Sequence, residues 1–497
     1  MLRATRRRIR TTLALFPAAL ARLDLVDDEK GEEAFDLAVP AMVTGGMRTM
    51  LRAADFFMVS LAAGPAAVAG LEMGFQYYFI PFGLALALSS GTISVVSRFK
   101  GSGDDAAADF AIKQSLWLAL ALSVPITVGT WVYAEPMIGV LTSNARTVAL
   151  GATYLRIVML SVSFRFWSMI AARALAGSGD TTTPMYVRLL TLPTNVVLNA
   201  VLIFGLGPFQ AYGVAGAAAG TAIANTLAAA IFFVVLVSGR RDVRLRLGGR
   251  QWDTGVANEI VRVGLPLAGT RLSRTFGRFP FLFVLGVLGT EVVAAYAIAR
   301  RVMLLAMMPA WGYSTAASTL VGQRIGAGED EVAADYGWQT LRIALATQLV
   351  IAVGIFLVAR PVALAFGTQH VDLTVAFIRA FGLGVAAFSV SRTMRGGLRG
   401  AGDTSWPFYG GLAGTYAVRL PLAALALPVG FVVTAGPLAL GPFSLGQLAF
   451  APGMGLGLLA VYAAILGDMY VRALVNTVRF ASGQWKAVAH TSAAGAD

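Results

Sequence analysis

The sequence predicts an all-α membrane protein built from twelve transmembrane helices in two homologous six-helix lobes. Three observations predict this fold class. Of the 497 residues, 57% are hydrophobic and 13% are charged, and the mean hydropathy of +0.71 lies far outside the range of soluble globular chains. Apolar runs of membrane-spanning length recur along the chain, and the second half repeats motifs of the first.

The two halves carry the same motifs in the same order. Gly-Ser-Gly-Asp-Thr-Thr-Thr-Pro in the first half realigns on Gly-Ala-Gly-Asp-Thr-Ser-Trp-Pro in the second. The paired anchors are Asp180 with Asp403 and Pro184 with Pro407 at an offset of 223, Gly101 with Gly326 at 225, and Pro40 with Pro266 at 226. A unit of about 220 residues is too long for a solenoid, so the repeat indicates two lobes, as in many membrane transporters.

Each predicted span is an apolar run long enough to cross a hydrocarbon core, which takes about 20 helical residues. Gly, Pro and charged residues separate the runs; Thr183 before Pro184, for example, is typical of a helix start. The first half gives spans 36–59, 66–97, 111–134, 148–172, 184–206 and 212–238. The second half gives 258–288, 291–322, 335–359, 373–396, 406–432 and 448–478.

These spans divide the chain into five parts. Residues 1–35 form a basic amphipathic arm, 36–238 the N-lobe, 239–257 a linker between the lobes, 258–478 the C-lobe, and 479–497 a tail. The arm resembles a secretory signal peptide, but cleavage would place the loops in the wrong charge phase, so a helix lying on the membrane surface is favoured.

The positive residues behind the net charge of +13 follow the order of the predicted loops. Arg and Lys crowd the N-terminal arm, the linker and every second loop, whereas the loops around 60–65 and 430–440 have none. This positive-inside pattern predicts a multi-pass protein of the plasma membrane with both termini and the linker in the cytoplasm. No basic stretch has the interleaved aromatic residues of a nucleic-acid module, so nucleic acid is not an expected partner.

Several kinds of chemistry are excluded by the residues that are missing. The chain has no cysteine, and its two histidines, His370 and His490, lie in polar or terminal stretches. Disulfides, thiolate metal sites and histidine-based catalytic centres are therefore not expected. No Gly-Lys-Ser/Thr follows a glycine-rich loop, which excludes a nucleotide-binding P-loop. The sequence predicts neither an enzyme nor a covalently bound cofactor, and energy would come from an ion gradient or another protein.

Ionisable side chains inside a span cost about 2.5–3.5 kcal/mol each on insertion scales, so each needs a reason. In the first span, Arg48, Arg52 and Asp55 share one helical stripe. Arg274 and Arg278 repeat the arginines in the seventh span, but the counterpart of Asp55 is apolar. The arginines could line a cavity or lock a lobe by pairing. We expect Asp55 to serve a task of the first lobe.

The fifth span carries two amides one turn apart. Asn195 and Asn199 face the same side, and their counterparts Val418 and Leu422 are apolar. Asn199 follows Pro184 by 15 residues, as Asp55 follows Pro40, so both would lie at a similar depth. These amides could serve an ion site or hold helices together. Methionines near 303–308 could line a pliable cavity or pack between helices.

Taken together, the chain resembles the multidrug and toxic compound extrusion (MATE) transporters, particularly the archaeal and DinF-like branch. The motifs behind the resemblance run from Pro40 to Asp55, through Asn-Val-Val-Leu-Asn-Ala-Val-Leu-Ile-Phe-Gly, and from Gly213 to Thr221. The resemblance implies a V-shaped arrangement of the two lobes. It also implies cation-coupled export of small organic compounds or drugs across the bilayer, and we expect a monomer.

The same resemblance implies roles for individual residues. It implies an ion-coupling site, and a metal site if the ion is Na⁺ rather than H⁺, formed by Asp55, Asn195, Asn199 and Thr221. We further expect a substrate cavity lined by Arg48, Arg52, Arg274, Arg278 and Met303, and hinges at Pro40 and Pro266. Asn199 departs from the family pattern, which has Asp there, so the coupling ion is left open. The arginines favour an alternative, a flippase or exporter of anionic or lipid-linked cargo in the same superfamily.

Overall fold

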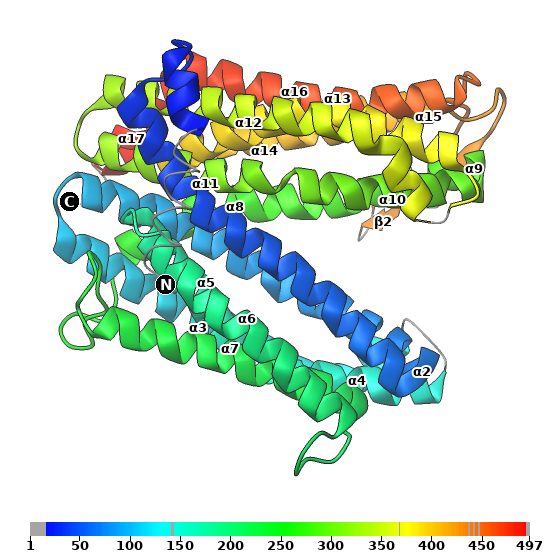
Figure 1. Ribbon diagram of the computed structural model, residues 1–497, viewed down its shortest axis with the longest axis horizontal. Helices are drawn as coiled ribbons and strands as arrows, with labels where there is room; N and C mark the ends of the chain where they lie inside the picture. The colour runs from blue at the N-terminus through cyan, green and yellow to red at the C-terminus, as the bar shows by residue number, and fades with distance from the viewer. Residues whose placement is uncertain are drawn as a thin grey trace.

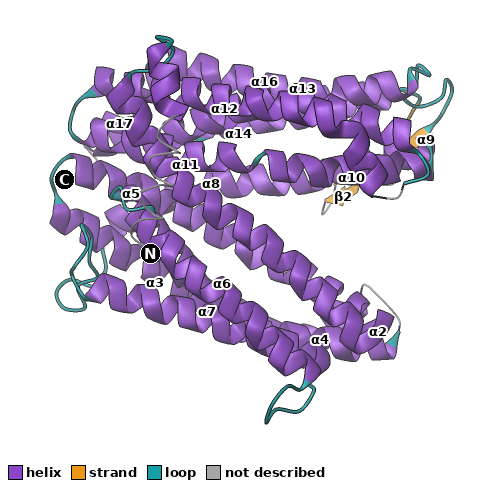
Figure 2. Ribbon diagram, in the orientation of Figure 1, coloured by secondary structure: helices purple, strands orange, loops and turns teal. Residues whose placement is uncertain are grey.

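The computed structural model describes residues 16–140, 144–366, 368–435, 438–440, 443–445 and 448–493. Within its helices, some side chains are also outside the description, among them those of 48–57. The described chain is helical almost throughout, with short strands confined to one end of the molecule (Figure 2). This agrees with the predicted all-α fold class.

The N-lobe contains the first six long helices. They are α2 (Asp28–Gly101), α3 (Asp105–Gly139), α4 (Ala145–Leu160), α5 (Val162–Gly177), α6 (Thr182–Phe204) and α7 (Gly213–Val237). The C-lobe begins with α8 (Thr254–Phe276), α9 (Arg278–Leu288), α10 (Thr290–Ala306), α11 (Met308–Gly326), α12 (Asp330–Ala365) and α13 (Val371–Gly400). It ends with α14 (Ser405–Leu412), the π-helix η1 (Ala413–Arg419), α15 (Leu420–Ala424), α16 (Gly457–Ala481) and α17 (Gln484–Ala493).

Helix α2 contains two predicted spans. A straight helix of 74 residues would be about 110 Å long, yet both of its ends contact the same part of the C-lobe. Near its start, Glu33 accepts a hydrogen bond of 2.7 Å from the Tyr336 hydroxyl. At its end, Gly101 lies against the carbonyl of Gln323. The helical run therefore doubles back, and its two arms correspond to the predicted spans 36–59 and 66–97.

The other predicted spans also have helical counterparts. Among the described residues, seven helices are long and apolar enough to cross a membrane, or nine if the bent pairs α4–α5 and α10–α11 each count as one span. The first arm of α2, the pair α8–α9 and the run α14–η1–α15 occupy the remaining three predicted spans. Twelve spans are thus accounted for.

Two helices start at other residues than the predicted spans. Helix α2 begins at Asp28 rather than near 36, because the Asp27 side chain caps it by accepting a hydrogen bond from the Lys30 N–H. The last span begins at Gly457 rather than 448. Before it, strands β1 (Val433–Ala435) and β4 (Leu448–Phe450) pair, as do β2 (Leu438–Leu440) and β3 (Phe443–Leu445). Glycines at positive φ, Gly455 and Gly457, end this extended segment.

The two lobes form a V. Figure 1 shows α2–α7 and α8–α16 as two groups of helices that meet at one end and diverge toward the other. Each lobe has its own large apolar core. We call the end where the lobes meet the closed end. The start of α2 and α17 lie there, since Lys30 pairs with Asp335 and Lys486 with Glu331, both near the start of α12. The linker lies there too, since Lys100 at the end of α2 donates to the Asp242 carbonyl.

At the closed end, equivalent residues of the two repeats touch each other. A β-carbon at Gly101 would lie 1.8 Å from the carbonyl oxygen of Gln323, and one at Gly326 would lie 1.9 Å from that of Arg98. Because 98 and 323, like 101 and 326, are 225 residues apart, the two contacts are copies of one contact. We call this the glycine junction. Only glycine allows the backbones of α2 and α11 to approach this closely.

Hydrogen bonds around the glycine junction follow the same symmetry in their donors, and their acceptors differ from it by one residue. The Thr319 hydroxyl donates to the carbonyl of Ala176 at 2.7 Å, and the equivalent Ser94 hydroxyl donates to that of Gly400 at 3.3 Å. Each bond links one lobe to the other. The duplication seen in the sequence therefore also appears in the contacts that hold the two lobes together at the closed end.

Candidate functional site

One face of α6 is polar and buried inside the N-lobe. Thr191, Asn195 and Asn199 are spaced four residues apart, so they share this face, and their exposed fractions are 2%, 3% and 0%. The Asn195 Nδ2 and the Thr191 hydroxyl find no hydrogen-bond partner among the described residues. Unsatisfied polar atoms in such a position are costly. Both atoms therefore need a partner outside the described residues.

Helix α7 meets this face through glycines. A β-carbon at Gly220 would lie 2.0 Å from the Asn199 Oδ1, so the amide occupies the space that a side chain at 220 would need. One turn earlier, Gly216 lies against the carbonyl of Leu202 in the same way. Thr221, which is half-buried, directly follows Gly220. The structure thus brings three of the four predicted coupling residues into one region of the N-lobe.

The donor set of this region is neutral oxygen and nitrogen. Within the described part of the chain, no group of three or more His, Cys, Asp or Glu side chains could hold a metal ion. Amide and hydroxyl oxygens can coordinate a hard cation such as Na⁺, and a carboxylate beside them would balance its charge. The predicted carboxylate, Asp55, lies on α2, and its side chain is outside the described residues.

The predicted cavity residues have different positions. The side chains of Arg48, Arg52 and Arg274 lie outside the described residues, whereas Arg278 is exposed at the start of α9. Met303 is 2% exposed and packs in the C-lobe core. A flexible thioether in this position fills space between larger side chains, and a role of Met303 in a substrate cavity stays a prediction.

The two predicted hinges have matching local structure. Helix α2 continues through Pro40 and α8 through Pro266. Four residues later, Thr44 donates its hydroxyl to the Pro40 carbonyl and Thr270 donates to the Pro266 carbonyl, both at 2.9 Å. A proline removes a backbone hydrogen bond and weakens the helix at that turn. Whether the lobes bend at these prolines stays a prediction.

Sequence reasoning missed a second polar cluster in the N-lobe. Arg165 of α5 donates to the Asn225 Oδ1 of α7 at 3.3 Å, and Asn225 donates to the Tyr78 and Ser161 hydroxyls at 3.4 and 3.1 Å. Arg188 of α6 lies close enough to Arg165 for the two charges to repel. The available signal was the presence of arginines inside the predicted spans, Arg156 and Arg165 in 148–172 and Arg188 in 184–206.

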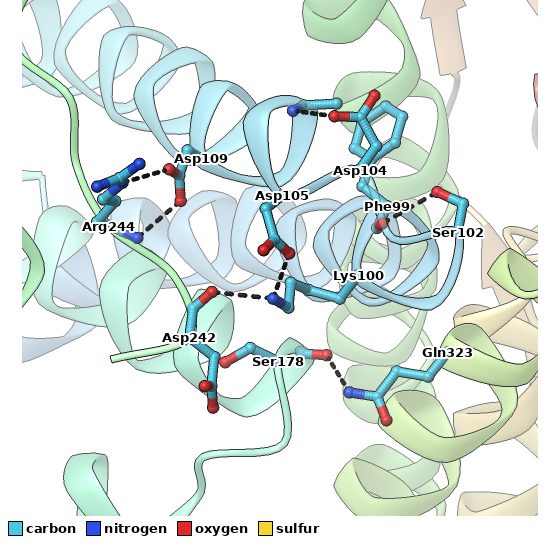
Figure 3. Close-up of polar contacts among 12 residues, drawn as sticks. Phe99, Lys100, Ser102, Asp104, Asp105, Asp109, Ser178, Asp242, Arg244 and Gln323 are labelled. Carbon is cyan, nitrogen blue, oxygen red and sulfur yellow. Dashed lines mark hydrogen bonds and ion pairs between the residues drawn. The ribbon is translucent and has the colours of Figure 1, made fainter. Parts of the chain in front are cut away.

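The linker is held against the N-lobe by ion pairs. Asp109 of α3 is buried and accepts hydrogen bonds from the Arg244 N–H at 2.8 Å and from its Nε at 3.2 Å. Figure 3 shows this contact beside Lys100, which reaches the Asp105 carboxylate and the Asp242 carbonyl. At the end of the linker, a hydrogen bond from the Val256 N–H lowers the pKa of Asp253.

A buried ion pair also joins the lobes at the closed end. Arg98 of α2 bonds the carboxylate of Glu259 on α8, and the two side chains are only 10% and 13% exposed. Removing one partner of such a pair leaves a buried charge and costs about 3–5 kcal/mol. We expect Glu259→Gln to lower the unfolding free energy by that order in detergent solution, and the swapped pair Arg98→Glu with Glu259→Arg to recover part of it.

The matched control for that experiment is Arg360→Gln. Arg360 bonds Asp372 at 2.9 Å, but both side chains are largely exposed. An exposed pair contributes about 0–1 kcal/mol. Equal stability of Glu259→Gln and Arg360→Gln, measured by denaturant unfolding, would show that the pair of α2 and α8 does not hold the lobes together.

Known proteins share the fold and the duplication. The sequence profile of the MatE family matches residues 40–201 and again 266–425. The two matches begin at Pro40 and Pro266, so they confirm the two homologous halves and the offset between them. They cover well over half of the chain.

Curated relatives match most of the chain. A probable multidrug resistance protein NorM of Thermotoga maritima is 27% identical over 461 residues, covering 92% of this chain and 93% of that protein. An FAD transporter of Shewanella oneidensis is 23% identical over 343 residues, covering 68% of this chain and 75% of that protein.

Solved structures match the fold. The crystal structure of a MATE protein in the bent conformation superposes with a TM-score of 0.81 at 23% identity, covering 93% of this chain and 97% of that chain. A MOP superfamily transporter from Pyrococcus furiosus, described as having a binding pocket of reverse polarity, gives 0.78 at 22% identity, covering 92% of this chain and 97% of that chain. The chain therefore belongs to the MatE family, the multidrug and toxic compound extrusion transporters, and is a membrane transporter rather than an enzyme.

Proposed function

We propose that the chain is a secondary active antiporter that exports organic compounds and is driven by proton or sodium influx through the N-lobe. The observation that carries this proposal is the buried amide face of α6. Asn195 and Asn199 lie inside a membrane lobe, Asn199 fits against Gly220 of α7, and the equivalent positions of the C-lobe are apolar. Polar side chains buried in a membrane helix commonly mark an ion pathway.

Asp55 would provide the charge of this coupling site. With Asn199 where the family pattern has Asp, the proposed set contains one carboxylate. One carboxylate can load and release a single proton, whereas Na⁺ would rely on the neutral oxygens of Asn195, Asn199 and Thr221 for the rest of its shell. The donor chemistry therefore favours H⁺ slightly over Na⁺.

The cargo has two candidate classes. Drugs and toxins are supported by the relatives named as probable multidrug resistance proteins. Anionic or lipid-linked compounds are supported by the arginines inside the spans, and by the relative named as an FAD transporter. We place the protein in the plasma membrane as a multi-pass monomer with the closed end in the cytoplasm, in agreement with the positive-inside pattern.

Transport into proteoliposomes tests the function directly. The purified chain is reconstituted, a pH gradient or a Na⁺ gradient is imposed, and the movement of cationic dyes and of FAD is followed. The proposal expects at least one compound to move only with one of the gradients. Movement that ignores both gradients would exclude secondary active transport, and the compounds that move would separate the two cargo classes.

The topology predicts which loops face the outside. The chain has no cysteine, so single cysteines can be introduced into a silent background. We expect an impermeant thiol reagent on intact cells to label Gln210→Cys, between α6 and α7, and Val429→Cys, after α15. Gly248→Cys in the linker should stay unlabelled until the cells are opened; a β-carbon at 248 meets nothing within 4 Å. Labelling of Gly248→Cys on intact cells would invert the topology.

A further inference from the structure

The second polar cluster of the N-lobe contains donors without matching acceptors. The side chain of Asn225 has one acceptor atom, Oδ1, which accepts a hydrogen bond from Arg165. The Arg165 Nε is buried without a partner among the described residues. The Tyr78 hydroxyl accepts from Asn225, but its own hydrogen finds no acceptor in the described part of the chain. Arg188, also buried, makes no hydrogen bond to a described residue. The cluster therefore presents several N–H and O–H groups to one region and lacks acceptors for them.

The same cluster carries two positive charges that nothing in the described structure neutralises. Neither Arg165 nor Arg188 forms an ion pair with a described Asp or Glu, whereas buried Asp109 and Glu259 have arginine partners elsewhere. Arg188 is buried and Arg165 is half-buried, so two like charges lie within one membrane lobe. Such charges are unfavourable unless an opposite charge joins them.

Aromatic rings line the region around these charges. The Arg165 guanidinium lies 5.3 Å from the ring centre of Phe82 and 5.9 Å from that of Tyr78. Arg188 lies 5.9 Å from the ring centre of Phe232. Cation–π contacts contribute about 0.5–2 kcal/mol each, which only partly offsets the desolvation of a guanidinium. Phe82, which is half-buried, also offers a flat apolar face to a ligand.

We infer that the N-lobe binds the anionic group of an aromatic compound between Arg165 and Arg188. A carboxylate, sulfonate or phosphate would accept from the free Arg165 Nε, the Tyr78 hydroxyl and Arg188, and its charge would relieve the repulsion between the arginines. The ring of the compound would pack against Phe82, which is half-buried. This site deepens the proposed function, on which its role in transport rests, by naming an anionic substrate class.

Ligand binding without any gradient tests this inference. The purified full chain in dodecyl maltoside is titrated calorimetrically with four probes that share one ring: 2-naphthoate, naphthalene-2-sulfonate, neutral 2-naphthamide and 2-naphthylmethylammonium. We expect the two anions to bind at least tenfold tighter than the amide and the amine. Dioleoylphosphatidylglycerol as a competitor identifies a lipid headgroup as the source of the anion if it displaces 2-naphthoate, and a free organic anion if it does not.

Substitutions then assign the binding to the cluster. We expect Arg165→Gln and Arg188→Gln each to weaken 2-naphthoate at least tenfold and to leave 2-naphthamide unchanged. Arg188→Lys, which keeps the charge but loses the planar fork, should retain part of the preference. The control is Arg156→Gln at the outer end of the same lobe, where Arg156 pairs with Glu135 at 3.1 Å. It should bind 2-naphthoate like the unaltered chain.

Two outcomes would overturn the inference. One is an unaltered chain that binds 2-naphthoate no better than 2-naphthamide, which is also the result expected if the protein supplies its own counter-ion to the arginines. The other is an anion preference that survives in folded Arg165→Gln and Arg188→Gln. Both results are independent of the proposed antiport, because gradient-driven movement of cationic dyes would be unaffected by them.

Discussion

Alanine at Gly326 will keep the lobes from meeting at the closed end. Its β-carbon would lie 1.9 Å from the carbonyl oxygen of Arg98, and a carbonyl in a helix cannot move aside without shifting the whole of α2. Gly101→Ala creates the equivalent clash with Gln323. Overpacking of this kind costs about 1–3 kcal/mol, so each change should reduce the population of the closed end about 5- to 150-fold.

Spin labels at Gln210 and Val429, on the outer ends of the two lobes, report the opening of the V. In Gly101→Ala and Gly326→Ala we expect the distribution of distances between the labels to shift, and transport to fall at least tenfold. Gly354→Ala in α12 and Gly129→Ala in α3 are controls, since a β-carbon there meets nothing within 4 Å. If Gly326→Ala gives the same distances and transport as these controls, the glycine junction does not govern the closed end.

Asp55→Asn will abolish gradient-driven transport while leaving the protein folded. The proposed coupling site has one carboxylate, and its other members, Asn195, Asn199 and Thr221, are neutral, so an amide at 55 leaves no group that can change charge. Transport should fall to the rate measured without a gradient. Asn199→Asp, which adds a second carboxylate beside Gly220, should increase the dependence of transport on Na⁺.

The control for this experiment is Asp372→Asn at the start of α13. The Asp372 carboxylate is 87% exposed, and its replacement should leave gradient-driven transport unchanged. Transport that survives intact in Asp55→Asn would falsify the coupling assignment. Asp468 in the C-lobe would then be the next candidate for the coupling carboxylate. That carboxylate bonds Arg472 on the same helix, and Arg472 also donates to the Thr415 hydroxyl of the π-helix η1 at 2.6 Å.

The sequence was sufficient to predict the fold class because hydropathy and duplication are properties of the chain itself. Apolar length fixed the twelve spans, and the paired prolines fixed the two halves. The start of the last span could not be predicted the same way. The segment 448–456 is as apolar as a membrane helix, but Pro452 and the glycines after it favour extended structure.

The candidate site was predictable only in part. Asn195 and Asn199 stood out because their counterparts are apolar, and the structure places both on the buried face of α6. Arg165 and Arg188 did not stand out, since neither has a charged neighbour at helical spacing: Arg156 lies nine residues before Arg165 in the same span, and Arg188 is the one charge in its span. Their significance depends on the packing of α5 against α6 and α7, which brings together residues 23 positions apart, and on the absence of nearby described carboxylates. Neither the packing nor the lack of nearby carboxylates can be predicted from a single segment of the sequence.

The glycine junction has the geometry of an isologous interface. Each half presents Arg98 or its equivalent Gln323 to the glycine of the other half, as two copies of one subunit do across a twofold axis. In a homodimer of half-length chains, a single mutation at this contact would change the interface at two places, once in each subunit. Joining the halves by the linker removed that constraint. The first copy could then gain Asp55, Asn195 and Asn199, while the second copy kept apolar residues at those positions and still made the contact.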